Sequence, residues 1–480
     1  MTGRPAEKTM EAPAAAGAFD SHSVEREDTI AAIATPPGTG GVSIVRISGT
    51  DALAVGDTFI RLRRGGTLSA LRGWSVALGE AVESDSGRTV DEVIAVVMRA
   101  PRSYTGEDVV EVQCHGGRLV TEKVLDMALS GGARHAGPGE FTRRAFLSGR
   151  ITLDQAESVL DLIDAPSSTS LLEAGRRLTG ELGSRIRDWD NRVLGALAAL
   201  QAGVDFPEDV DDQSAEAAGE VEAVGSEIRD LLSQAPLGLA LTTGIEVCLV
   251  GGPNAGKSSL FNALLGQERA IVTEVPGTTR DVLRERTEWG GLPVALLDTA
   301  GLRETCEVVE AIGVERARSA ASASEVILYV VDDTAGLTAE DRSWLSRWGE
   351  RRLLVAVNKV DACAHLVSEE EINEITRGNW IRVSALTEEG LEQVKERIAA
   401  WFSHGGYPEG AIPGSARQVD CLRRAEEAIS IALAHLAEGW TEDVVVLSLE
   451  DAARAFAELT GKNVSEETLD QVFSRFCVGK

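Results

Sequence analysis

The chain has 480 residues, 43% of them apolar, and its 76 acidic and 47 basic residues give it a net charge of −29. This length and apolar content predict two to four domains with ample core. The sequence contains no long uninterrupted apolar run, which argues against a membrane-spanning helix. The excess of acidic residues argues against a large nucleic-acid-binding surface.

Residues 1–27 are rich in Ala, Gly, Pro and charged residues and contain few large apolar ones, so they are expected to form a disordered extension. They lack an apolar h-region and contain acidic residues, which argues against secretory or mitochondrial targeting. The six cysteines are scattered, with no Cys-x-x-Cys pair. This usage is typical of reduced thiols, and a cytoplasmic protein is expected.

Residues 28–150 alternate short β-like runs with turns and carry 14 basic and 14 acidic residues, so the acidity of the chain lies elsewhere. The pattern predicts an α+β domain. Because this domain is balanced in charge, any RNA contact is expected to be local or shared with a partner protein. We expect strands over 30–34, 42–47, 93–98 and 109–113, and helices over 118–129 and 139–148.

Helical patterns dominate residues 151–243 and return in residues 403–480. A single long helix is expected over 171–204, where apolar residues recur at spacings of three and four until Pro207 interrupts the pattern. Residues 244–402 have a different, alternating strand and helix pattern. We therefore expect the two helical parts to pack as one bundle, with residues 244–402 inserted between them as a separate domain.

Residues 251–258 read Gly-Gly-Pro-Asn-Ala-Gly-Lys-Ser, between a predicted strand (245–250) and a predicted helix (259–265). This is the pattern and context of a phosphate-binding loop, in which glycines let backbone N–H groups point at a phosphate. Lys257 is expected to reach the β- and γ-phosphates, and Ser258 to ligate Mg²⁺. The predicted nucleotide-binding residues of this loop are Asn254, Ala255, Gly256, Lys257, Ser258 and Ser259.

Further motifs follow predicted strands in the order typical of a GTP-binding domain. Strand 294–297 ends in Asp298, which can hold Mg²⁺ through water, and Gly301 leaves its N–H free for the γ-phosphate. Asp361, after strand 353–357, can accept two hydrogen bonds from guanine, whereas adenine would leave it partly unpaired at a cost of roughly 2–3 kcal/mol. GTP is therefore predicted, with ATP a poor second. Strands 326–331 and 381–383 complete the pattern, and the remaining predicted contacts are Thr299, Ala300, Asn358, Lys359, Ser384, Ala385 and Leu386.

The loop between the first two motifs pairs threonines in a way that suits a nucleotide-dependent switch. Leu302 follows Gly301 and cannot orient water as the glutamine of Ras-like GTPases does, so a carboxylate in the same segment is expected to replace it. Glu310 is the candidate, and Glu304, Glu307 and Glu315 are rivals by spacing alone. The switch residues are Thr273, Glu274, Val275, Pro276, Gly277, Thr278 and Thr279.

Three stretches outside residues 244–402 resemble the tRNA-modification GTPase family MnmE, also called TrmE. The first contains Ala34-Thr35-Pro36-Pro37-Gly38 and Arg46-Ile47-Ser48-Gly49. The second runs from Tyr104-Thr105-Gly106-Glu107-Asp108 to His115-Gly116-Gly117 and Pro138-Gly139-Glu140-Phe141. The third is Phe476-Cys477-Val478-Gly479-Lys480. The resemblance covers residues 28–480.

The resemblance implies an N-terminal domain that binds 5-formyl- or methylene-tetrahydrofolate and forms a homodimer, followed by a split helical domain with an inserted GTPase domain. It also implies a heterotetramer with the FAD-dependent protein MnmG that acts on the anticodon region of certain tRNAs. There the complex would install a carboxymethylaminomethyl-type group at C5 of the wobble uridine, using a one-carbon unit from the folate and GTP hydrolysis. No membrane association is implied.

The resemblance also assigns roles to particular residues. Glu310 matches the catalytic glutamate, and Cys477 matches a cysteine with either a role in the modification chemistry or a packing role. Thr279 joins Ser258 as a Mg²⁺ ligand. Arg150 stands where the family often has lysine, and Pro276 is a departure within the K⁺ loop. The implied folate contacts are Arg46, Glu111, Arg150 and Lys480, and the implied K⁺ ligands, in place of an arginine finger, are Asn254, Thr273, Val275 and Thr278.

Two other functions fit part of the sequence. An RNA-binding switch of the ribosome-assembly type would explain the GTPase motifs but not residues 28–150, and it predicts a basic appendage that the sequence lacks. A stand-alone folate-dependent enzyme with a regulatory GTPase domain would need its redox steps from a partner, because the chain has no flavin motif.

Overall fold

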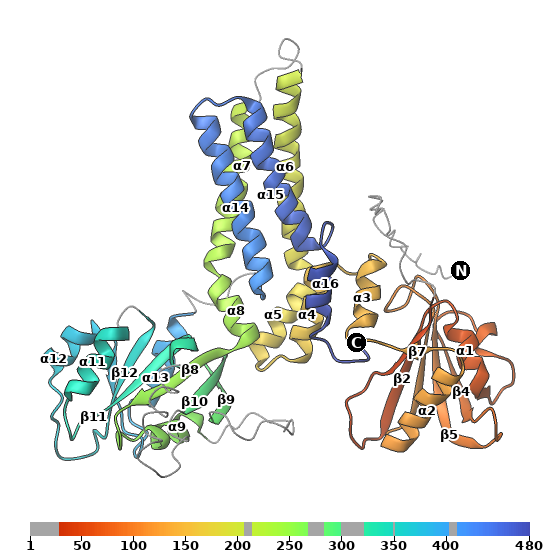
Figure 1. The fold of residues 1–480 in the computed structure, drawn as a ribbon, viewed down its shortest axis with the longest axis horizontal. Helices are drawn as coiled ribbons and strands as arrows, with labels where there is room; N and C mark the ends of the chain where they lie inside the picture. The colour runs from red at the N-terminus through yellow and green to blue at the C-terminus, as the bar shows by residue number, and fades with distance from the viewer. Residues whose placement is uncertain (1–27, 206–213, 267–282, 299–320, 349–350, 403–409) are drawn as a thin grey trace, which may run out of the picture. The chain divides into compact units, whose positions relative to one another are not determined.

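The computed structural model describes residues 28–205, 214–266, 283–298, 321–348, 351–402 and 410–480. They fall into two compact units (Figure 1). The first comprises the chain up to Arg150 together with Phe473–Lys480, and the second is Ile151–Val472. Within the described ranges, no helix combines the length and the apolar character needed to cross a bilayer. The multidomain fold predicted from the sequence is confirmed, and the expectation for residues 1–27 lies outside the described residues.

The first unit is built on a seven-stranded sheet in the order β3-β4-β5-β6-β2-β1-β7. Neighbouring strands are antiparallel except β1 and β7, which are parallel. The strands are β1 (Ile30–Ile33), β2 (Val42–Ser48), β3 (Ile60–Leu62), β4 (Ser75–Val82), β5 (Thr89–Met98), β6 (Val109–His115) and β7 (Arg134–His135), and the helical elements are α1 (Ala52–Phe59), η1 (Leu68–Ala70), α2 (Arg118–Ser130) and α3 (Glu140–Leu147).

Alternation along the central strands gives this sheet two different faces. Val45 and Ile47 of β2 and Val110 and Val112 of β6 are fully buried in the core that α1 and α2 cover. The residues between them, including Arg46 and Glu111, therefore point to the opposite face, where α3 packs Phe141 against Ile30 and Ala32. The sheet thus buries an apolar face and leaves a polar face for a site.

The second unit contains a six-stranded sheet in the order β13-β12-β11-β8-β10-β9. Its strands are parallel except for β9, which forms an antiparallel hairpin with β10. The strands are β8 (Ile245–Gly251), β9 (Leu283–Trp289), β10 (Leu292–Asp298), β11 (Val326–Asp332), β12 (Leu353–Asn358) and β13 (Trp380–Arg382), and the helices are α9 (Lys257–Leu265), α11 (Ala339–Trp348), α12 (Glu369–Thr376) and α13 (Leu391–Ala400).

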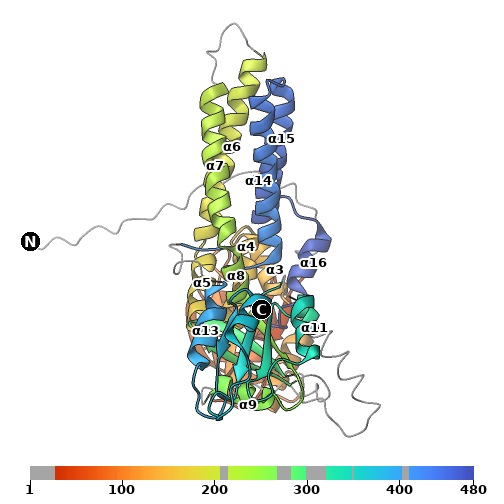
Figure 2. The ribbon, with the colours of Figure 1, turned by 90° about the vertical axis from the view of Figure 1, so that its left-hand side faces the viewer.

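Two helical segments, one before and one after this sheet in the chain, pack together as a bundle, as predicted. The four long helices α6, α7, α14 and α15 lie side by side (Figures 1 and 2) around buried residues such as Trp189 and Phe456. The helices are α4 (Leu153–Ile163), α5 (Ser168–Leu178), α6 (Glu181–Asp205), α7 (Ser214–Ser233), α8 (Ala235–Thr243), α14 (Ala416–Ala437), α15 (Glu442–Thr460) and α16 (Glu466–Phe473).

The prediction of one long helix over 171–204 is wrong, because α5 and α6 are separate helices. Gly180 lies between them with φ of 88°, a left-handed conformation that ends a helix and that glycine adopts without steric cost. The apolar spacing continues across the break, so periodicity alone does not reveal it. Strands β4 and β9 and helix α1 are further elements that the sequence analysis did not predict.

Candidate functional sites

The predicted nucleotide-binding residues gather at one edge of the six-stranded sheet. The parallel strands β8, β10 and β12 end at Gly251, Asp298 and Asn358, and the chain after β13 reaches Ser384 at the same edge. In open α/β sheets, ligands bind outside the carboxyl ends of the strands. The topology therefore brings together motifs that are separated by more than a hundred residues in the chain.

The loop 251–258 wraps tightly before α9 begins at Lys257. Gly256 has φ of 90°, and a Cβ at this position would lie 2.3 Å from Nδ2 of Asn358. That amide nitrogen donates to the Ala255 carbonyl (2.9 Å). A residue with a side chain at position 256 would have a strained backbone, and its Cβ would clash with the Asn358 amide. Both the backbone conformation and the available space therefore require glycine.

Lys257 and Ser258 occupy the first turn of α9. Lys257 is buried, and its Nζ donates to the carbonyl oxygens of Gly251 (3.0 Å) and Gly252 (2.7 Å). Ser258 Oγ donates to Oδ2 of the buried Asp298 at 3.3 Å. The ammonium group of Lys257 and the hydroxyl of Ser258 thus lie together at a helix N-terminus, where the helix dipole favours an anion, and the Asp298 carboxylate of β10 lies beside Ser258.

The other end of this edge is organised around Asn358, Lys359 and Asp361. Oδ1 of Asn358 accepts from Ala385 N (3.1 Å), so this side chain links loop 251–258 to the chain after β13. Asp361 Oδ1 accepts from Ser384 Oγ (2.6 Å), while Leu386 is largely exposed. The carboxylate of Asp361 is therefore oriented by Ser384.

Lys359 connects loop 251–258 to the end of β11. Its Nζ donates to the Asn254 carbonyl (2.8 Å) and to Oδ2 of Asp332 (2.6 Å) at the end of β11. Burial alone would raise the pKa of Asp332, but hydrogen bonds from Lys359 and Thr334 hold it below its usual value. The sequence analysis did not predict Asp332 as a site residue. Its position directly after the predicted strand 326–331 could have indicated it, because acidic residues at strand ends can reach a site at that edge of the sheet.

Several predicted site residues lie outside the described part of the chain. They are the switch residues Thr273–Thr279, the continuation of the Asp298 motif Thr299, Ala300 and Gly301, the catalytic candidate Glu310 and its rivals Glu304, Glu307 and Glu315. Ser259 is described, and it is exposed in the first turn of α9.

Arg46 and Glu111 form an ion pair on the polar face of the first unit. They are register partners on β2 and β6, and Nε of Arg46 lies 2.8 Å from Oε1 of Glu111. Two guanidinium groups pack against the Tyr104 ring, those of Arg46 (5.4 Å from the ring centroid) and Arg150 (5.5 Å). Nη1 of Arg150 also donates to the Ser103 carbonyl. Two of the four predicted folate contacts, Arg46 and Arg150, thus pack against one aromatic ring, and a third, Glu111, pairs with Arg46.

The last residues of the chain complete this cluster. Arg46 Nη1 donates to the Gly479 carbonyl at 3.4 Å, across 433 positions of sequence. Phe141 N donates to the Lys480 carbonyl (3.1 Å), and Pro138 forms a β-bridge with Val478. The structure therefore brings Gly479 to Arg46 and Lys480 to Phe141, and Cys477 is exposed.

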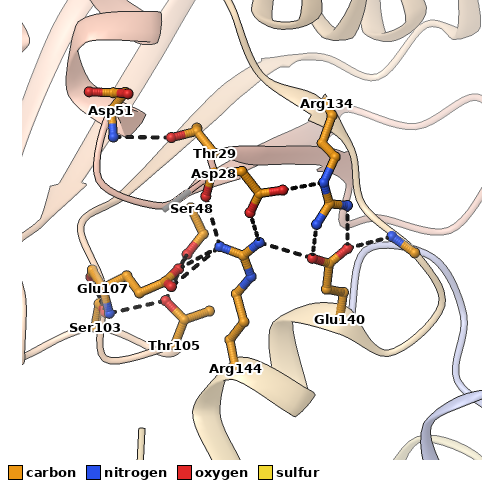
Figure 3. A network of polar contacts seen from close by, with 11 residues as sticks. Asp28, Thr29, Ser48, Asp51, Ser103, Thr105, Glu107, Arg134, Glu140 and Arg144 are labelled. Carbon is orange, nitrogen blue, oxygen red and sulfur yellow. Dashed lines mark hydrogen bonds and ion pairs between the residues drawn. The ribbon is translucent and has the colours of Figure 1, made fainter. Parts of the chain in front are cut away.

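A network of ion pairs joins the loop between β5 and β6 to α3 and to Asp28, which precedes β1 (Figure 3). Arg144 of α3, of which only 8% is exposed, donates to Asp28 Oδ1 (2.6 Å), Glu140 Oε1 (2.9 Å) and Glu107 Oε2 (3.2 Å). Burial would raise the pKa of Glu140, but Arg134, Gly137 and Arg144 hold it below its usual value. This network ties the loop that carries Tyr104 to α3 and to the start of β1.

Sequence reasoning missed Tyr104 and Phe141 as members of this cluster. Arg46 packs against both rings, at 5.4 Å and 5.5 Å from their centroids. Both residues lie in the stretches that carry the family resemblance, so that resemblance was the signal that could have found them. Their contact with Arg46 depends on the fold and could not be read from spacing.

Two family models match the chain. The model described as "GTP-binding protein TrmE N-terminus" matches residues 29–150, and the model described as "MnmE helical domain" matches residues 153–477. The chain belongs to the tRNA modification GTPase MnmE family. This membership confirms the resemblance stated above, and it confirms the predicted enzyme class, a GTPase that acts in tRNA modification.

Curated MnmE relatives match over almost their whole length. The protein of Moorella thermoacetica is 43% identical over 461 residues, which span 95% of this chain and all of the relative. That of Symbiobacterium thermophilum is 45% identical over 458 residues, again 95% of this chain and all of the relative. Among solved structures, the G domain of the T. maritima FeoB iron transporter is 25% identical, with 33% of this chain and 99% of that chain covered and a TM-score of 0.26.

Proposed function

We propose that this protein hydrolyses GTP to drive a folate-dependent modification of tRNA. Working with an FAD-dependent MnmG partner, it would install a carboxymethylaminomethyl-type group at C5 of the wobble uridine, with a one-carbon unit taken from 5-formyl- or methylene-tetrahydrofolate. The observation that carries this proposal is the cluster of Arg46, Glu111, Tyr104 and the Cys477–Lys480 tail in the first unit. A GTPase that only times RNA association has no use for such a cluster.

The chemistry of this cluster suits a folate. A pterin ring presents an N–H and an amino group side by side, as guanine does, and a carboxylate such as Glu111 can accept from both. The cationic groups of Arg46, Arg150 and Lys480 suit the carboxylates of a folate tail, and Tyr104 offers a ring face to an aromatic ligand. A bound folate would supply the one-carbon unit. The protein residues would bind and orient it.

The nucleotide-binding edge suits GTP with Mg²⁺. Asp361 is proposed to read guanine, Lys257 to contact the phosphates, and Ser258 with Thr279 to ligate Mg²⁺. Oxygen donors are what Mg²⁺ prefers, and the 3.3 Å contact of Ser258 Oγ with Asp298 Oδ2 supports a cation position between loop 251–258 and β10. K⁺, held by Asn254, Thr273, Val275 and Thr278, is proposed to supply positive charge where an arginine finger otherwise would.

Hydrolysis is proposed to need Glu310 to orient the attacking water. The remaining nucleotide contacts proposed are Ala255, Gly256, Ser259, Glu274, Pro276, Gly277, Thr299, Ala300, Gly301, Asn358, Lys359, Ser384, Ala385 and Leu386. Cys477 is proposed to take part in the modification chemistry. If a Cys477→Ser variant still modified tRNA fully, the role of Cys477 would be limited to packing.

The domains proposed are 28–150 for folate binding, 151–243 and 403–480 for the helical bundle, and 244–402 for GTP hydrolysis.

A cytoplasmic homodimer is proposed. Support for a dimer comes from Val76, Leu78 and Ile94, which are 70%, 40% and 40% exposed on the neighbouring strands β4 and β5. Apolar side chains grouped on an exposed sheet face are typical of an interaction surface.

Mass analysis of wobble nucleosides tests the proposal. In tRNA from cells that lack this protein, the C5-modified uridine should disappear, and it should return with the wild-type gene but not with Glu111→Gln. Unaltered anticodon uridines in the deletion strain would refute the proposed substrate. Return of the modification with Glu111→Gln at wild-type level would refute the folate site.

A further inference from the structure

Helix α5 contacts both segments that join the sheet of the second unit to the helical bundle. The chain enters the sheet through α8 and returns through the residues that precede α14. Ser170, Glu173 and Arg177 of α5 are spaced three and four residues apart, so they share one face of this helix. All three are buried, with at most 4% of each residue exposed.

Arg177 contacts the entering and the returning segment at once. Its Nη2 donates to Thr242 Oγ1 of α8 (3.4 Å), and its Nη1 donates to the Ile412 carbonyl of the returning segment (3.4 Å). The same guanidinium pairs with Asp161 of α4, with 2.8 Å between Nη2 and Oδ2. A planar guanidinium with five donors can serve three partners in fixed directions, which a lysine ammonium cannot do.

The two segments also touch each other through glycines. A Cβ at Gly238 of α8 would lie 2.1 Å from the Pro413 carbonyl oxygen, and a Cβ at Gly414 would lie 2.5 Å from Cζ of Arg177. Backbone and guanidinium are therefore packed without an intervening side chain. In such close packing, one segment cannot shift without displacing the other or Arg177.

The first turn of α5 reaches the nucleotide-binding sheet directly. Ser170 Oγ donates to the Leu241 carbonyl of α8 (2.6 Å), and Ser167 Oγ donates to the Gly291 carbonyl in the turn between β9 and β10 (3.1 Å). From this turn β10 runs to Asp298, which contacts Ser258 at the nucleotide-binding edge. A single strand thus connects that edge to α5.

We propose that α5 is the element through which nucleotide binding moves the helical bundle, with Arg177 as the positioning residue that holds both connecting segments. The inference rests on the proposed function, since it assumes that GTP-driven motion serves chemistry elsewhere in the chain. It adds the physical connection for that motion. Ser167, Ser170 and Arg177 carry it, while Asp161 orients the guanidinium.

Hydrogen–deuterium exchange of the full chain tests this connection, with Mg²⁺ and K⁺ present and either GDP or a non-hydrolysable GTP analogue bound. In the wild type, peptides of α5 should differ in protection between the two nucleotides, as should peptides of loop 251–258. Arg177→Lys keeps the charge facing Asp161 but cannot meet three partners, so most of the α5 difference should be lost. GTP turnover should stay within about threefold of wild type.

Arg417→Lys is the matched control. Arg417 also pairs with a carboxylate of α4, Glu157 (2.8 Å), and among the described residues its other hydrogen bonds are to carbonyl groups of α15. This variant should keep the α5 difference. Ser170→Ala, which removes one hydroxyl and retains the helix, should lose part of it. Circular dichroism melting would confirm that each variant is folded.

The outcomes separate this inference from the proposed function. A wild-type protein in which loop 251–258 responds to the nucleotide and α5 does not would overturn the inference alone. So would an Arg177→Lys variant with the full α5 difference, or equal losses in Arg177→Lys and Arg417→Lys. A normal α5 response in a protein whose deletion leaves wobble uridines unaltered would support the inference and overturn the proposed function.

Discussion

The two candidate sites of this chain are built in different ways. At the nucleotide-binding edge, loops at the ends of parallel strands supply backbone groups, and side chains such as Asn358 and Lys359 fasten one loop to another. In the first unit, the site consists of side chains on a sheet face, closed by a tail from the far end of the chain and supported by the ion pairs of the buried Arg144. A site of loops can change shape between ligand states, whereas a site on sheet strands is fixed in advance.

This difference predicts that variants of one site leave the other intact. Glu310→Ala should have the largest effect, slowing GTP turnover by about 10²-fold or more with GTP affinity nearly unchanged. Single-turnover hydrolysis and nucleotide titration measure the two quantities. Glu304→Ala is the control and should turn over normally. Equal losses of binding and turnover in Glu310→Ala would remove this residue from the catalytic role.

Asp361→Asn should weaken GTP binding by about 100-fold, because the amide cannot accept both guanine hydrogen bonds. The same variant should bind xanthosine triphosphate better than the wild type does, since its amide can donate to the xanthine oxygen. Competition binding with both nucleotides measures the exchange of preference. Folate binding should be unaffected, and a parallel loss there would show that the two sites are not independent.

Arg46→Ala should lower folate affinity by roughly 10- to 100-fold, the effect of losing a charged hydrogen bond of about 1.5–3 kcal/mol. Calorimetric titration with 5-formyl-tetrahydrofolate measures it. Arg134→Ala is the control, because the Arg134 side chain is 44% exposed and its ion pairs are with Asp28 and Glu140. GTP turnover should be unchanged in both variants. Equal folate losses in both would assign the effect to general loosening of the unit.

Exchange of KCl for NaCl at equal ionic strength should slow GTP turnover by about tenfold or more. K⁺ is larger than Na⁺ and has a different coordination distance, so Na⁺ should not replace it in stabilising the transition state. Folate affinity should not respond to this exchange. Turnover that is indifferent to the cation would refute the assigned K⁺ ligands.

Tyr104→Phe should have the smallest effect. The Tyr104 hydroxyl and Thr142 Oγ1 are 2.9 Å apart, and losing this bond should cost about 1 kcal/mol of stability and a few-fold in folate affinity. The aromatic ring that contacts Arg46 and Arg150 remains. Tyr104→Leu, which removes the ring, should lose more affinity than Tyr104→Phe, and the reverse order would contradict the proposed stacking.

The same difference between the sites explains what the sequence could reveal. Loop 251–258 and the residues after β12 are contiguous motifs, so their places at the sheet edge followed from strand prediction alone. Arg46 and Gly479 meet across 433 positions, and no local pattern indicates such a contact. The resemblance supplied Arg46, Glu111, Arg150 and Lys480, but not Tyr104, which joins them only through the fold.

Helix boundaries show a similar limit. The sequence predicted helical structure for the region around Gly180 correctly, but the apolar spacing of α5 runs on into α6. The break depends on one backbone conformation. A glycine permits this conformation, but its presence in the sequence does not by itself predict a break. Strand β9 was missed because its residues, Leu-Arg-Glu-Arg-Thr-Glu-Trp, are mostly charged.

The register of β2 against β6 has a consequence for how this family can vary. Arg46 and Glu111 are paired across these strands, and side chains alternate between faces with each residue. Inserting one amino acid before Arg46 or Glu111 within its strand would turn that side chain toward the apolar core. The altered gene would still encode every recognisable motif while its product had lost the ligand pocket. Length changes should therefore be tolerated in the turns and selected against within these strands.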